Sequence, residues 1–61
     1  MSKEEAVKQL NDKEFSTRLE NGVVVIEVRS ESERARAKRA IREIGYDASW
    51  GVRGVMKHDY T

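Results

Sequence analysis

The chain has 61 residues, the length of one small domain spanning 1–61. It buries only about 60% of the surface that its unfolded form exposes. It contains no cysteine, which excludes disulfides and thiolate metal sites as sources of stability. Charged residues make up 38% of the chain but nearly cancel at a net charge of +1, so the overall charge favours neither an anionic nor a cationic partner.

The distribution of apolar residues argues against a membrane protein. The longest aliphatic run, 23–26, is far too short to span a bilayer. No apolar stretch follows the N-terminus, so we expect no signal peptide. Together with the absence of cysteine, this pattern favours a cytoplasmic location. Residues 57–61 are predicted to form a frayed tail.

The first predicted element is a short helix over residues 3–11. Ser2 is followed three residues later by Glu5, the spacing of a capping box. Ala6, Val7 and Leu10 then recur at helical spacing. Because an isolated helix of this length is marginal in water, it must pack against another element.

The second predicted element is a hairpin in 15-FSTRLENGVVVIEVR-29. Asn21-Gly22 is a strong signal for a two-residue turn, since both residues tolerate positive φ. Such a turn pairs Leu19 with Val24, and directly paired residues share a face. One face is then almost wholly apolar: Phe15, Thr17, Leu19, Val24, Ile26 and Val28. The other face consists of Ser16, Arg18, Glu20, Val23, Val25, Glu27 and Arg29.

A three-residue turn over residues 20–22 is the alternative. It would pair Phe15 with Glu27 and Ser16 with Ile26, and so mix apolar with polar residues on both faces. A one-residue slip exchanges the two sides of a strand. The clean separation of the faces therefore favours the two-residue turn.

A second helix is predicted in 30-SESERARAKRAIREIG-45. Ser30 and Glu33 form another capping box, and Gly45 is suited to the position just after the helix. The apolar residues follow a helical stripe whose small members allow close approach to a sheet: Ala37, Ala40, Ile41 and Ile44.

A third strand is predicted within residues 46–56. Tyr46, Ala48, Trp50 and Val52 alternate with small or polar residues, which is the period of a half-buried strand. Gly51 and Gly54 weaken this strand and indicate a bulge or an edge.

These elements give the order α-β-β-α-β and an α+β fold. The second strand, second helix and third strand form a crossover, which is right-handed in about 98% of known cases. Placing both helices on the same face of a three-stranded sheet gives two layers.

Trp50 has two interpretations. The alternation places it on the same side as Ala48 and Val52, facing the core. The competing interpretation is an exposed aromatic beside Arg53 that stacks on a base or ring.

The favoured function is a small non-enzymatic module that binds a protein, including a second copy of itself. Two helices on one face leave the other face open, with Val23 and Val25 as an apolar patch inside a charged rim. The edge of the third strand belongs to the same proposed surface. We expect Val25→Lys to weaken assembly without unfolding the protein. The candidate partner-binding residues are Arg18, Val23, Val25, Glu27, Gly51 and Arg53.

The alternative function is nucleic-acid binding through the second helix. Arg34, Lys38 and Arg42 form one row along this helix, with Arg36 and Arg39 further round it. Such a row can follow phosphates. The simpler interpretation is the solvated side of an amphipathic helix, because acidic residues dilute the field.

Catalytic and cofactor sites are not expected. The single histidine, His58, lies near the C-terminus next to Asp59. No serine has a histidine partner within a credible framework, and no phosphate-binding loop is present. We therefore expect no metal, no cofactor and no small-molecule substrate.

Two stretches resemble known families. The segment 40-AIREIGYDA-48 resembles the last helix and strand of heavy-metal-associated domains, which bind metal through a Cys-x-x-Cys that this chain lacks. The α-β-β-α-β order, with 21-NGVVVIEV-28 before a charged helix, is similar to the BON domain of envelope proteins. That second resemblance implies a module that associates with lipids or a partner.

Overall fold

The computed structural model describes residues 1–54, so Val55, Met56 and the predicted tail at 57–61 lie outside the described part. Two helices and three strands follow the predicted order: α1 (Lys3–Asp12), β1 (Ser16–Glu20), β2 (Val23–Val28), α2 (Glu31–Glu43) and β3 (Trp50–Gly54). The sheet order is β1-β2-β3, with β1 antiparallel and β3 parallel to the central strand.

Both helices begin at the predicted serine caps. The Oγ atoms of Ser2 and Ser30 accept hydrogen bonds at 3.1 Å from the backbone N–H groups of Glu5 and Glu33. These bonds satisfy donors that the first turn of a helix otherwise leaves unpaired. The Glu33 side chain also accepts a bond of 2.9 Å from the N–H of Arg29, which holds the chain entering α2.

The hairpin adopts the two-residue turn. Asn21 and Gly22 have φ values of 54° and 79°, as this turn requires. The register pairs Leu19 with Val24 and Thr17 with Ile26. The three-residue alternative, which pairs Ser16 with Ile26, is therefore wrong. The predicted pairing of Phe15 with Val28 falls outside the register, because β1 begins at Ser16.

The third strand starts later than predicted, at Trp50 rather than Tyr46. Gly45, at φ 81°, ends α2, and its N–H donates to Arg42 O at 3.0 Å while that of Tyr46 donates to Ile41 O at 3.3 Å. This pair of bonds is the Schellman motif, in which an apolar residue after the glycine packs back on the helix. Tyr46 is thus buried as part of the helix end, and the following Ala48 is exposed.

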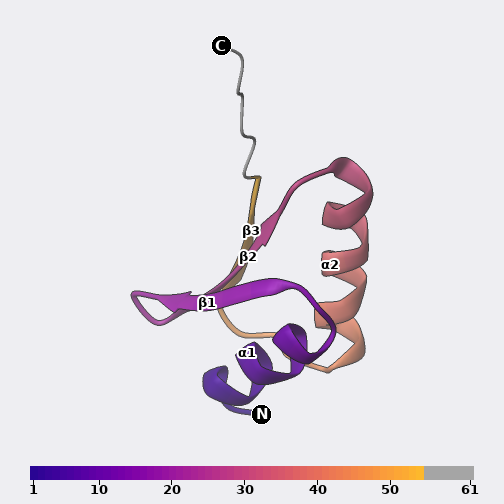
Figure 1. The fold of residues 1–61 in the computed structure, drawn as a ribbon. Coiled ribbons are helices and arrows are strands. Elements are labelled where there is room, and N and C mark those ends of the chain that lie inside the picture. The colour runs from indigo at the N-terminus through magenta and orange to yellow at the C-terminus, as the bar shows by residue number, and fades with distance from the viewer. Residues whose placement is uncertain (55–61) are drawn as a thin grey trace.

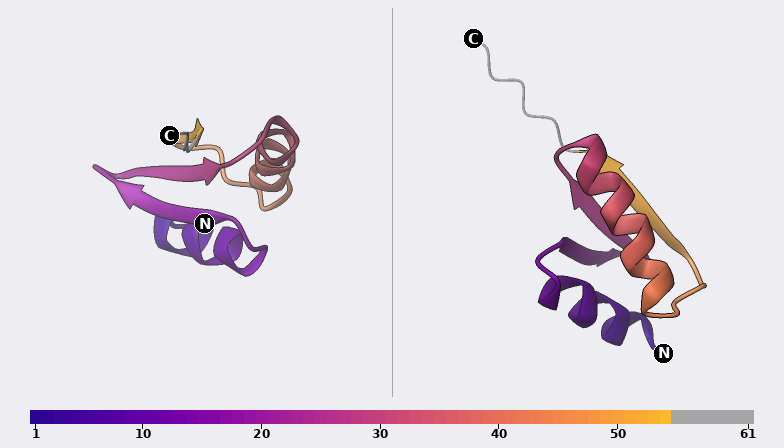
Figure 2. Two further views of the ribbon diagram at one scale, coloured as in Figure 1. Left: turned by 45° about the horizontal axis from the view of Figure 1, so that its top comes forward. Right: turned by 90° about the vertical axis from the view of Figure 1, so that its right-hand side faces the viewer.

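Both helices pack on one face of the sheet, as predicted, and bury a single core there. α1 contributes Ala6 and Leu10, and α2 contributes a stripe centred on Ile41. In Figure 2, α2 lies along β2 and β3, whereas α1 lies against β1. The sheet is strongly twisted, so that β1 crosses β2 at a steep angle in Figure 1.

Leu19 departs from the prediction for this face. It is 36% exposed, although its neighbours Thr17, Val24 and Ile26 on the same side are buried. The hairpin turn projects away from α2 in Figure 1. Leu19 lies next to this turn, at the end of the sheet that the helices do not fully cover.

Two buried hydroxyls, Thr17 Oγ1 and Tyr46 OH, have no hydrogen-bond partner within residues 1–54. A buried polar group without a partner reduces stability. We expect Thr17→Val to raise the free energy of unfolding by about 1 kcal/mol, because valine keeps the branched shape and the backbone bonds. Urea denaturation checks this, and a loss of stability would show that the hydroxyl is satisfied.

Candidate functional site

The candidate site is the face of the sheet opposite the helices, called here the open face. Side chains alternate across a strand, and the register places all six predicted partner-binding residues on this side. They come from three strands, in the order Arg18 on β1, Val23, Val25 and Glu27 on β2, and Gly51 and Arg53 on β3.

Four charged side chains on this face join into one ion-pair cluster, consisting of Arg18, Glu20, Glu27 and Arg53. Arg18 donates to Glu20 at 2.9 Å and to Glu27 at 2.8 Å. Arg53 forms a two-pronged contact with Glu20, at 2.7 and 3.2 Å, and approaches Glu27 at 3.9 Å. The fork of an arginine fits a carboxylate in this way.

The cluster spans the whole sheet. Glu20 lies on one outer strand beside Val23, and Arg53 lies on the other outer strand beside Glu27. Their ion pair therefore crosses the central strand diagonally, and the position between those two rows is Val25. The sequence places Glu20 on this face but does not identify it as part of the site. The face assignment, combined with the opposite charges at its ends, is the signal that points to it.

The predicted apolar patch is wrong at its centre. Val25 is only 8% exposed, although no helix of the described chain covers this face. From the register we infer that the stem of Arg18, its direct cross-strand neighbour, and the diagonal ion pair cover it. Val23 and Gly51 are half-buried. The open face thus presents a mixed-charge surface rather than an exposed hydrophobic one.

The cluster lowers the pKa of Glu20, the carboxylate to which both arginines donate hydrogen bonds. The pKa of Glu20 lies below its ordinary value of 4.5, chiefly because Arg53 donates hydrogen bonds to it and also through the positive charges of Arg53 and Arg18; partial desolvation opposes this shift. A carboxylate with a lowered folded-state pKa adds stability above the unfolded pKa. That contribution is lost as the pH falls below 4.5 through the folded value.

We expect Arg53→Gln to raise the pKa of Glu20 toward its ordinary value, because the strongest cause of the shift is removed. Carbon-13 NMR titration of the Glu20 carboxylate measures this directly. Arg39→Gln, on the exposed side of α2, is the matched control and should leave the titration unchanged. An unaltered pKa in Arg53→Gln would contradict the ion pair.

The basic residues of α2 lie on a different part of the molecule. Lys38, Arg36, Arg39 and Arg42 are exposed, since the opposite side of the helix packs in the core. Arg34 is half-buried and approaches Glu31 at 4.0 Å. The predicted basic row therefore lies on the solvent-exposed side of α2, which is separate from the open face.

Trp50 and Arg53 do not form a stacking site. The two residues are three positions apart on β3, and side chains alternate along a strand, so they project to opposite faces of the sheet. The indole is half-buried and packs against the core cluster. The interpretation of Trp50 as a core residue is therefore confirmed, although part of the ring stays exposed.

No group of three or more acidic, histidine or cysteine side chains is positioned to hold a metal ion within residues 1–54. His58 and Asp59 lie outside this range. Neither helix of the described part is long and apolar enough to cross a membrane.

No family model, curated protein or solved structure matches this chain. The resemblances to heavy-metal-associated and BON domains therefore stay predictions.

Proposed function

We propose that the chain is a small, non-enzymatic module that binds a protein through the open face and the adjoining edge of β3. The observation that carries this proposal is the ion-pair cluster on a face that neither helix covers. Its side chains remain substantially accessible, with Arg18 at 55% and Arg53 at 48% exposure.

The arrangement of charge supports one kind of partner. Two arginines and two glutamates alternate over a buried valine, so the surface complements a partner with both acidic and basic groups. Such surfaces contribute specificity and association rate more than affinity. A cytoplasmic location, and the absence of cofactor, membrane and small-molecule ligands, belong to the same proposal.

The test is site-directed photo-cross-linking. A photo-reactive amino acid at Val23, on the open face, is expected to give a discrete protein adduct in native lysate. The same group at Arg39, on the outer side of α2, is the control and should not. Arg53→Glu should weaken the adduct, because it breaks the bridge to Glu20. Equal labelling from both positions, or none from Val23, contradicts the proposal.

Nucleic-acid binding is the second candidate, favoured by the exposed cations of α2. It predicts binding that weakens with added salt and with alanine at Arg34, Lys38 and Arg42. A gel-shift assay at low salt decides this, and failure to retard any DNA or RNA removes the candidate.

A further inference from the structure

The outer edge of β3 carries backbone groups that are directed away from the sheet. Val24 N–H donates to Ser49 O at 3.1 Å, which fixes the phase of the parallel ladder. Alternate residues of a strand bond to the neighbouring strand through their backbone groups. The backbone N–H and C=O groups of Gly51 and Arg53 therefore point toward β2. Trp50, Val52 and Gly54 therefore direct their N–H and C=O groups to the free side, where the described chain places no further strand.

The opposite edge of the sheet is closed at its centre. Thr17 on β1 directs its backbone groups outward, and the Asn11 side chain bonds to both of them. Thr17 N–H donates to Asn11 Oδ1 at 2.9 Å, and Asn11 Nδ2 donates to Thr17 O at 3.2 Å. A side-chain amide thus takes the place of a neighbouring strand. Proteins commonly blunt edge strands in such ways, and the described residues place no comparable cap on β3.

The sequence of β3 suits antiparallel pairing with a second copy of the same strand. In 50-WGVRG-54, antiparallel pairing of two copies about Val52 sets Trp50 opposite Gly54 and Arg53 opposite Gly51. Each bulky side chain then faces a glycine. The residues with outward backbone groups also pair with one another, as the hydrogen-bonded positions of an antiparallel ladder require. A Cβ on Gly51 would meet no atom within 4 Å, so the position has room for the stem of an arginine.

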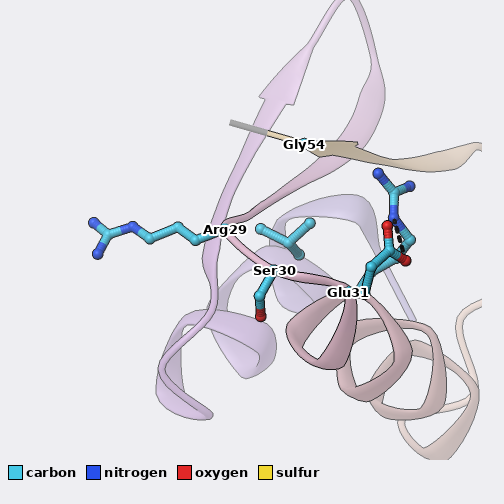
Figure 3. A pocket seen from close by; sticks show the side chains of 6 residues that line it. Arg29, Ser30, Glu31 and Gly54 are labelled. Carbon is cyan, nitrogen blue, oxygen red and sulfur yellow. Dashed lines mark ion pairs between the residues drawn. The ribbon is translucent and has the colours of Figure 1, made fainter. Parts of the chain in front are cut away.

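A hollow lies beside Gly54, where the exposed part of a partner's indole would sit. It has a volume of about 350 Å³ and is lined by Val28, Arg29, Ser30, Glu31, Arg34 and Gly54. Figure 3 shows the ion pair of Glu31 on the side of α2 facing Gly54, while Arg29 extends away from that strand. Arg34 Nη2 lies 3.2 Å from the place that a Cβ on Gly54 would occupy. An aromatic ring over Gly54 therefore lies beside a guanidinium, a favourable cation–π arrangement.

The geometry points to a second copy of this chain as the partner of the β3 edge. Two β3 strands pair antiparallel about Val52 and join two sheets into one, and the exposed part of each indole covers Gly54 of the other copy. Aromatic cover of a cross-strand glycine stabilises strand pairing. This inference rests on the proposed function for its choice of a protein partner.

Cysteine cross-linking tests the arrangement in the full chain, which has no native cysteine. Val52→Cys is expected to form a disulfide between copies, because the two-fold axis brings the residue opposite itself. Leu19→Cys, exposed on the other outer strand, is the control and should not. Failure of Val52→Cys to form this disulfide, or equal cross-linking of Leu19→Cys, overturns the inference.

Sedimentation of the uncross-linked protein supplies the second measurement. We expect a dimer that dissociates on dilution. Gly51→Arg should weaken it about tenfold, because two arginines then lie opposite each other in both symmetry-related pairs. Gly51→Glu, which places a carboxylate opposite Arg53, should weaken it less than Gly51→Arg does. A parent that remains monomeric at millimolar concentration overturns the inference, whereas the proposed function fails separately, by the loss of the Val23 adduct.

Discussion

Replacing Leu10 with alanine is expected to lower the free energy of unfolding by about 3 kcal/mol, whereas the same change at Leu19 costs less than about 1 kcal/mol. Leu10 is fully buried between α1 and the sheet, and Leu19 is 36% exposed. The chemical change is identical in the two variants. The difference between them therefore reports the packing at each position.

Urea denaturation followed by circular dichroism measures both variants. A domain of this size gains rarely more than about 3–5 kcal/mol from its core, so Leu10→Ala should be largely unfolded in water and Leu19→Ala should remain folded. Equal effects at the two positions would mean that α1 does not cover the sheet as described.

Replacing Val25 with alanine is expected to cost about 2 kcal/mol, the value of a buried valine side chain. Val25 is 8% exposed beneath the diagonal ion pair of Glu20 and Arg53. The control is Val23→Ala, on the same strand and face but half-buried, which should cost about half as much or less. Thermal and urea unfolding of the two variants give the comparison.

This result would also change how the open face is probed. The sequence alone suggests that Val25→Lys leaves folding intact, but a buried position in the central strand does not tolerate a charge without loss of stability. Variants of Arg18 and Arg53 therefore report on binding more cleanly. If Val25→Ala and Val23→Ala were equally mild, the ion-pair cluster would not cover Val25.

Local patterns predicted the elements and the register well. Asn21-Gly22 fixed the turn, and the turn fixed which residues share a face. Ser30 and Gly45 marked the two ends of the second helix within a residue. These signals are short-range, since each depends on backbone conformation or on hydrogen bonds between near neighbours.

Long-range features were harder to predict. The burial of Val25 depends on an ion pair between Glu20 and Arg53, which are 33 positions apart. The exposure of Leu19 depends on how far the helices extend along a twisted sheet. Tyr46 matched the alternation of a strand, but the helix-ending hydrogen bonds determined its place. The Asn11 cap on β1 has no recognisable sequence pattern.

The register of the hairpin is the claim on which both faces and the candidate site depend. Nuclear Overhauser effects between α-protons test it directly, because non-hydrogen-bonded antiparallel pairs bring these protons close together. The structure predicts cross-peaks between Thr17 and Ile26 and between Leu19 and Val24. A cross-peak between Ser16 and Ile26 in their place would contradict the account. It would mean that β1 is shifted by one residue relative to β2, so that the buried and open sides of β1 are exchanged.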